Sequence, residues 1–307
     1  MPRYIVKTKR NKLLVCLAVA AVATLLAVTV FTGPAIPRFE PVPNPNGYED
    51  FVAAGQMLQG SAPSFKTGTV VQLRVYIDAN RAALERACLG LSRECRVHTE
   101  YSGYYITRHV LDIGPTRKIA DALAIEGKLA DLENRPWDAA IRYLESMKLG
   151  ADLARGGLGI DALLAAAAEA WGVMQIVTEI PKLNAEQSRA LIHELAGLEA
   201  TREPFEKILI REKMWSSRQG TLVERMKDSA EQLVTHSDTK MMEGVRSKYN
   251  QERRRVAQLE VDLARHAFEL ERGRKSTGWN DLVPSYLKTI PSFPGNTNDE
   301  KESPFVF

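Results

Sequence analysis

One uncharged stretch near the N-terminus constrains this chain more than any other feature. Residues 13–31 read LLVCLAVAAVATLLAVTVF, nineteen residues without a charge. At 1.5 Å of rise per residue, a helix of this length covers roughly 28 Å, which is close to the ~30 Å hydrocarbon core of a bilayer. The stretch therefore predicts a single transmembrane helix.

The charges around this stretch predict its orientation. Basic residues precede it and no acid does, whereas Arg38 is the only base between residues 32 and 46; the preceding bases are Arg3, Lys7, Lys9, Arg10 and Lys12. An excess of Lys and Arg marks the cytoplasmic side of a span. We expect residues 1–12 to be cytoplasmic and the rest of the chain after the span to lie outside the cytoplasm, in a bacterial cell envelope.

Three other interpretations of residues 13–31 compete with the anchor. A cleavable signal peptide stays open, although its apolar region is usually about 7–15 residues long and the sequence FTGPA at residues 31–35 is a poor cleavage site. A lipoprotein signal would need its cysteine at the end of the run, but Cys16 lies near the start. A buried core helix is disfavoured because such helices rarely lack a polar face.

The basic character of the whole chain comes from its first twelve residues. The formal net charge is +3, with 41 Lys and Arg against 38 Asp and Glu. Without the five bases before residue 13, 36 bases face 38 acids, so the remainder is slightly acidic. Nucleic-acid binding, which needs a basic stripe on the folded domain, is not predicted.

A proline-rich segment, residues 32–47, follows the span. It holds five prolines in the fifteen residues from Thr32 to Asn46. Proline fixes φ and cannot donate a hydrogen bond, so an extended spacer of up to roughly 45 Å is one expectation. The other is an irregular strap on the domain surface, because Ile36, Phe39 and Val42 could pack.

Residues 48–272 predict one large, mainly α-helical domain. Apolar residues at spacings of three, four and seven predict one helix from about Val70 to Gly90, and a helical hairpin that breaks at residues 134–136. An Asn184 and Gln187 capping box and Pro204 begin two more helices. The pattern loosens over residues 221–250, where serines, Gly244 and paired charges predict broken helix and loop. A final helix is expected over residues 252–272, with inward residues Val256, Leu259, Leu263, His266, Ala267 and Leu270.

Residues 158–180 form the most apolar part of this domain. Asp161, Glu169 and Glu179 argue against a second span, because an acid near the middle of a membrane helix costs about 2.5–3.5 kcal/mol. We expect a central core helix that Pro181 ends. Its alanine run would allow neighbouring helices to approach closely, and Trp171 would supply bulk.

Residues 122–150 resemble a single tetratricopeptide-type helical hairpin. The matching residues are Leu123, Gly127, the break at residues 134–136, Ala139, Ala140 and Tyr143. No second copy occurs at a 34-residue offset, although such repeats normally work in tandem. The resemblance implies a surface for binding other proteins.

Residues 266–296 resemble the end of the globular core in the bacterial pseudopilin family. The matching residues are Gly273, Arg274, Leu282, Val283, Pro284, Tyr286, Leu287, Pro291, Pro294 and Gly295. Lys275-Ser276 and Ser292-Phe293 depart from the family pattern. The whole arrangement also resembles uncharacterised membrane-anchored bacterial proteins. Residues 273–307 are expected to be irregular.

The sequence offers no recognisable catalytic, metal or cofactor site. The five histidines form no H-x-x-x-H pair, and the glycines at residues 156–159 are not followed by the Lys-Ser/Thr of a phosphate loop. No small-molecule ligand is predicted. Cys88 and Cys95 are a possible disulfide in an oxidising compartment, provided that a helix ends between them, because seven residues of straight helix separate two Cα atoms by ~10.5 Å.

These features favour a non-enzymatic scaffold or protein-interaction module anchored in the membrane. An accessory component of an envelope secretion or pilus-like assembly is the first alternative, because of the C-terminal resemblance. An envelope hydrolase with an unrecognised site is the second, and a deep pocket with clustered carboxylates would favour it.

Overall fold

The structure is a computed structural model, and it describes residues 20–21, 24, 39–102, 104–218 and 237–291. All regular secondary structure in these residues is helical. The basic segment with Lys7, Lys9, Arg10 and Lys12 and almost all of the predicted span lie outside the described residues. The predicted anchor and its topology therefore stay predictions.

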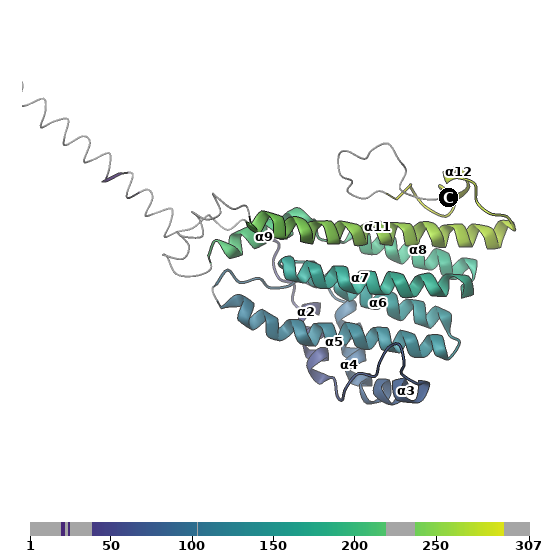
Figure 1. The fold of residues 1–307 in the computed structure, drawn as a ribbon, viewed down its shortest axis with the longest axis horizontal. Coiled ribbons are helices and arrows are strands. Elements are labelled where there is room, and N and C mark those ends of the chain that lie inside the picture. The colour runs from purple at the N-terminus through teal and green to yellow at the C-terminus, as the bar shows by residue number, and fades with distance from the viewer. Residues whose placement is uncertain (1–19, 22–23, 25–38, 103, 219–236, 292–307) are drawn as a thin grey trace, which may run out of the picture.

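The described helices stack as long rods, with α11 along one edge and α3 and α4 at the other (Figure 1). In chain order the helices are α2 (Gly47–Met57), α3 (Val70–Ala79), α4 (Arg81–Leu91), α5 (Tyr105–Leu132), α6 (Pro136–Ala154), α7 (Gly159–Glu179), the 3-10 turn η1 (Ile180–Lys182), α8 (Ala185–Ala200), α9 (Phe205–Ser216), α11 (Ser237–Arg272) and α12 (Trp279–Leu282). The prediction of a mainly α-helical body is confirmed.

The predicted hairpin is present as α5 and α6, which pack against each other along their lengths. Pro136 begins α6 at its first position, where the missing N–H costs nothing. A Cβ atom on Gly127 of α5 would lie 2.7 Å from the ring of Tyr143 on α6, so the absence of a side chain there lets the two helices meet. The resemblance to a tetratricopeptide hairpin is not tested by this geometry.

The expected core helix is α7, which packs between α6 and α11. It ends at Glu179, directly before the turn that contains Pro181, as expected. Within the described residues, Gly159–Lys182 is the one helical stretch that is long and apolar enough to cross a membrane by length and composition. Less than half of its most apolar window, 44%, is buried inside the molecule.

The single helix predicted from about Val70 to Gly90 is two helices in the structure, α3 and α4. The chain breaks at Asn80, between α3 and α4, because the Asn80 side chain accepts a hydrogen bond from the Gln59 N–H (2.6 Å) and donates to the Gln59 carbonyl (3.1 Å). The same amide donates to the Tyr76 carbonyl, which lies one turn back in α3 (2.8 Å). The apolar residues keep their helical spacing across the break, so periodicity alone predicts one helix where the structure has two.

The end of the chain differs from the prediction in two places. Residues 237–250 belong to the 36-residue helix α11, so the expected loop is wrong there, and residues 219–236 lie outside the described residues. Leu270 is 53% exposed and does not face inward. His266 is half-buried and its Nε2 lies 3.0 Å from the Leu183 carbonyl. The remaining predicted inward residues of α11 are buried: Val256, Leu259, Leu263 and Ala267.

The described part of the segment after α11, residues 273–291, is largely irregular, as expected, with one short helix, α12, and the rest of this segment lies outside the described residues. The described part packs onto the body: the Arg189 guanidinium of α8 lies over the Tyr286 ring, and the Tyr286 hydroxyl donates to Glu271 (2.7 Å). The described part of the pseudopilin-like element is thus an integral part of this body.

Candidate functional site

Residues 39–46, here named the strap, lie on the domain surface. Asn46 fixes one end: its side chain donates to the Arg96 carbonyl (2.8 Å) and accepts from the Arg96 N–H (3.0 Å), and it caps α2 by accepting from the Tyr48 N–H (3.2 Å). Of the two expectations for the proline-rich segment, the irregular strap on the domain surface describes residues 39–46, and residues 32–38 lie outside the described residues.

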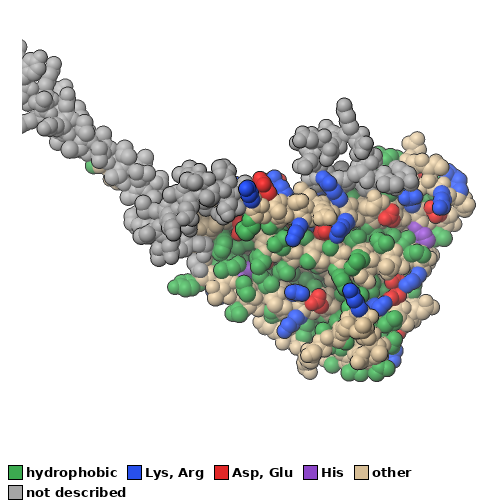
Figure 2. All heavy atoms as spheres, viewed as in Figure 1, with side chains coloured by type: hydrophobic (Ala, Val, Ile, Leu, Met, Phe, Trp, Pro, Cys, Tyr) green, Lys and Arg blue, Asp and Glu red, His purple; other side chains and the backbone are tan. Residues whose placement is uncertain are grey.

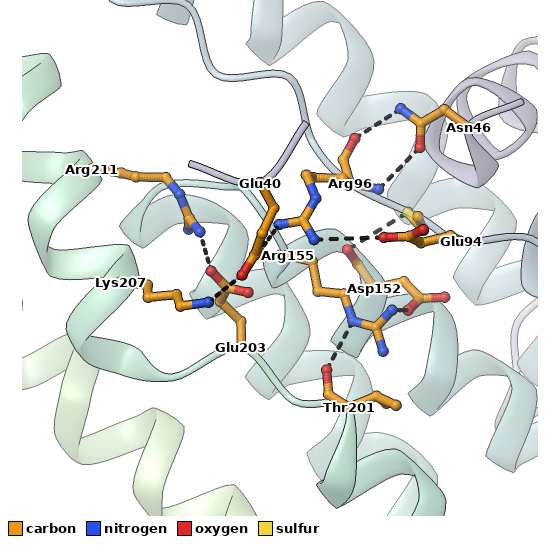
Figure 3. A network of polar contacts seen from close by, with 11 residues as sticks. Glu40, Asn46, Glu94, Arg96, Asp152, Arg155, Thr201, Glu203, Lys207 and Arg211 are labelled. Atoms are coloured by element: carbon orange, nitrogen blue, oxygen red, sulfur yellow. Dashed lines mark hydrogen bonds and ion pairs between the residues drawn. The ribbon is translucent and has the colours of Figure 1, made fainter. Parts of the chain in front are cut away.

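The other end of the strap is held by ring contacts and by charge, and Figure 3 shows the charged contacts. The Glu40 carboxylate accepts hydrogen bonds from Lys207 of α9 and from Arg96, each at 2.6 Å. Those two cations lower the pKa of Glu40. Phe39 stacks on Tyr101 and lies under the Arg211 guanidinium, 5.1 Å from it. The strap thus joins parts of the chain that are remote in sequence.

Beneath the strap, arginines bind the ends of helices together. Arg211 of α9 is buried, pairs with Glu203, and donates to the Gly157 carbonyl in the turn between α6 and α7 (3.3 Å). Arg155 donates to the Thr201 carbonyl at the end of α8 (2.9 Å). Both arginines already have protein partners. This junction between helix ends therefore holds the molecule together and is not an open anion-binding site.

A buried His–Asp pair lies close to this junction. His109 of α5 lies 2.7 Å from Asp161 of α7, and the Tyr48 hydroxyl of α2 lies 3.3 Å from the other ring nitrogen. Asp161 also accepts from the Leu158 N–H (2.8 Å). The His109 and Asp161 side chains are only 3% and 2% exposed, so a substrate has no access to them. The group joins three helices and caps α7.

Cys88 and Cys95 are both free in the structure. Helix α4 ends at Leu91, between them, as a bridge would require, but the two thiols have different partners. Cys95 is fully buried against the Asp152 carbonyl, whereas Cys88 lies 3.5 Å from Arg142. Burial raises the pKa of both thiols. The predicted disulfide is therefore absent from this structure.

A cleft of about 340 Å³ opens beside the hairpin. Its lining combines acids, arginines and apolar side chains: Glu126, Ala130, Arg135, Trp137, Asp138, Ile141, Arg142 and Glu145. Arg142 pairs with Glu126 (3.2 Å) and Glu145 (2.6 Å), and Arg135 pairs with Asp138. The carboxylates are thus clustered but neutralised by neighbouring cations, which leaves no free pair for acid–base work.

Metal binding was not predicted from the sequence. Over the described ranges, no group of three or more His, Cys, Asp and Glu side chains is arranged to hold a metal ion.

The outer face of α7 is the most distinctive surface of the described body. Its outward residues form a stripe without a charge, here named the α7 stripe: Ile160, Leu163, Ala167, Ala170, Met174 and Val177. Met174 is 52% exposed and Val177 is 44% exposed. Hydrophobic side chains gather over this part of the molecule, between charged groups on the neighbouring helices (Figure 2).

The acids of α7 explain why its outer face is uncharged. Asp161, Glu169 and Glu179 are all turned inward and buried. Glu169 accepts two hydrogen bonds from Arg202, at 2.7 and 2.9 Å, so a buried ion pair compensates its charge. In the sequence these acids argue against a membrane span, and the apolar face that they leave was not predicted. The helical spacing of the apolar residues could have indicated this face; they are Ile160, Leu163, Met174 and Val177.

Comparison with known proteins gives no relative for this chain: no protein-family model, curated protein or solved structure matches it.

Proposed function

We propose that this protein is a membrane-anchored scaffold. Residues 13–31 hold it in the membrane, and the helical body outside the cytoplasm binds a protein partner through the α7 stripe. The uncharged stripe supports this proposal most directly. A quarter of the chain, 26%, is charged, yet over 21 residues of α7 every charged side chain points inward.

An apolar partner face is the chemistry that fits such a stripe. Burying apolar surface provides most of the driving force of protein association, at roughly 25 cal/mol per Å² of area. The six stripe residues also recur at spacings of three and four, so an apolar helix of a partner could pack along the whole length of α7.

The test is a substitution that leaves the fold intact and changes only the stripe. Leu163 is 37% exposed, so Leu163→Glu should fold and lose partner capture when the protein is cross-linked in membranes and purified by a C-terminal tag. Val75→Glu on α3, at a position that is 64% exposed, is the matched control and should retain capture.

Two results would contradict the proposal. One is recovery of the bait from cross-linked wild-type membranes at monomer mass only, with no cross-linked species. The other is capture of the same partners, at the same yield, by Leu163→Glu and by the wild type. Equal thermal midpoints for both variants would show that any loss of capture is not caused by unfolding.

A further inference from the structure

We propose that the partner of the α7 stripe is a second copy of this chain, so that two bodies associate side by side on one membrane. This inference rests on the proposed function, because it assumes the membrane anchor. It commits to a parallel pair of α7 helices, packed along their stripes about a two-fold axis.

The spacing of the stripe is that of a two-stranded coiled coil. Its six residues follow one another at intervals of three, four, three, four and three, which is the a/d pattern of a heptad repeat. Ile160 occupies an a position and Leu163 the following d position, and among parallel coiled coils a β-branched residue at a with leucine at d favours two strands. In a two-fold pair each stripe residue meets its own copy.

The flanks of the stripe favour self-association as well. The e positions of this repeat are Leu164, Trp171 and Thr178, none of which is charged. In a parallel pair an e position faces a g position of the other helix, and the g positions, Gly159, Ala166 and Val173, are uncharged too, so the flanks bring no like charges together. The centre of the stripe is Ala167 and Ala170, whose small side chains allow two helices to approach closely.

The strap fixes which end of the body faces the membrane. Glu40 bonds Lys207 of α9, and α9 in turn bonds the N-terminus of α7, where Glu212 accepts from the Gly159 N–H (2.8 Å). The strap is therefore clamped at the end of the body where α7 begins.

The chain between the predicted span and the strap is short. Eight peptide steps separate Phe31 from Phe39, and they reach at most about 28 Å. Two copies anchored in one membrane thus hold Phe39 of each strap within this distance of it. Their stripes lie at similar heights and run in the same direction, which is the geometry that a parallel pair needs.

The area of the stripe explains why the membrane matters. A 21-residue helix is about 31 Å long and about 10 Å wide, so one stripe offers roughly 300 Å². A stable interface between soluble proteins buries about 800 Å² on each partner. Confinement to a membrane raises the effective concentration and lets a smaller contact suffice.

Cysteine cross-linking in membranes tests the pairing. We use the full-length chain with Cys16→Ala and Cys88→Ala, in which Cys95 is buried, and add one cysteine at a time. Leu163→Cys and Met174→Cys should each give a cross-linked dimer on oxidation. Glu186→Cys, at an exposed position of α8, is the control and should stay monomeric.

A charge exchange tests the register. In this cysteine background carrying Ala170→Cys, Leu163→Glu in both copies should lower the cross-linked fraction by at least about tenfold, because like charges would meet. Coexpressing Leu163→Glu with Leu163→Lys should restore cross-linking, since residue 163 faces its own copy in a parallel pair. An antiparallel pair would place residue 163 opposite Met174 instead, and the exchange would not restore it.

Two further results would overturn the inference. They are monomers at every stripe position and a cross-link to a different protein. The last result would remove the second copy and leave the proposed scaffold function intact. Absence of the chain from the membrane fraction would instead remove the proposed function itself.

Discussion

The contact between Gly127 and Tyr143 shows how one residue sets the distance between two helices. A Cβ atom at residue 127 would lie 2.7 Å from the ring of Tyr143, whose side chain is only 1% exposed. Gly127→Ala should therefore lower the free energy of unfolding by about 1–3 kcal/mol, because the core must shift to admit a methyl group.

Gly197→Ala is the matched control for this prediction. Gly197 also lies inside a helix, α8, but no atom outside its own helix stands within 4 Å of the added methyl group. Alanine should stabilise the chain there by roughly 0.5–1 kcal/mol. Urea unfolding of the two variants measures both effects, and equal effects in the two would refute the contact.

The two cysteines of the body give a second prediction at this scale. Intact mass should be the same with and without a reducing agent, because Cys88 and Cys95 are free. Alkylation of the folded protein should modify Cys88 well before Cys95, since Cys95 is fully buried and burial raises its pKa. A loss of two mass units that reduction reverses would establish the bridge that the sequence suggested.

Glu260 predicts how stability depends on pH. Burial and, to a lesser extent, the nearby Glu199 raise the pKa of Glu260 to about 7 from an ordinary value of 4.5. Between those two values the folded chain keeps a proton that the unfolded chain has released. The ionisation of Glu260 therefore opposes folding, and its cost grows as the pH rises from about 4.5 to about 7.

Glu260→Gln should remove this cost. The variant should match the wild type below about pH 4.5 and be more stable above pH 7, by the order of 1–2 kcal/mol, after allowance for partial solvent exposure. Glu243→Gln, at an exposed position on the same helix, is the control. Urea midpoints measured at several pH values would contradict the account if both variants gave the same pH profile.

At the scale of the elements, local signals were sufficient for some helices and not for others. The hairpin of α5 and α6 and the capping box of α8 follow from residues that are neighbours in the chain, and the structure confirms both. The break at Asn80 depends on the backbone of Gln59, 21 residues away, which no periodic pattern records.

The same reasoning explains the loop that was expected in place of the start of α11. Residues 237–250 have few apolar residues, but Met242, Val245 and Tyr249 are buried against Phe205, Ile208 and α7. Such tertiary packing stabilises a helix whose own sequence pattern is weak. The contacts that hold the strap and the His109–Asp161 pair also join distant residues, so the sequence alone did not predict these contacts.

The break between α3 and α4 makes a prediction about this element pair. Asn80 is 2% exposed, and its side chain holds both the N–H and the carbonyl of Gln59. Asn80→Ala should lower the free energy of unfolding by about 1–3 kcal/mol, because it leaves these backbone groups without partners. The exposed Ser92→Ala at the other end of α4 should change it by less than about 0.5 kcal/mol. Chemical denaturation would contradict this if the two changes were equal.

On the scale of the whole molecule, three parts matter for the proposed function: the predicted membrane span of residues 13–31, the strap and the α7 stripe. The strap attaches the N-terminal part of the chain to the end of the body where α7 begins. Helix α7, which carries the stripe, then runs away from that end through the middle of the stack of helices (Figure 1). The proposed membrane tether thus joins the body at the end where the apolar α7 stripe begins, which suits assembly on a membrane.

The anchor is the premise of this account, and one measurement tests it most directly. The full-length chain, with a C-terminal tag, is separated into membrane and soluble fractions, and intact and opened cells are treated with protease. The account predicts full-length protein in the membrane fraction, with the tag digested only when protease reaches the outer side of the cytoplasmic membrane. Soluble protein that lacks its first thirty or so residues would contradict it, as would a tag that only cytoplasmic protease can reach.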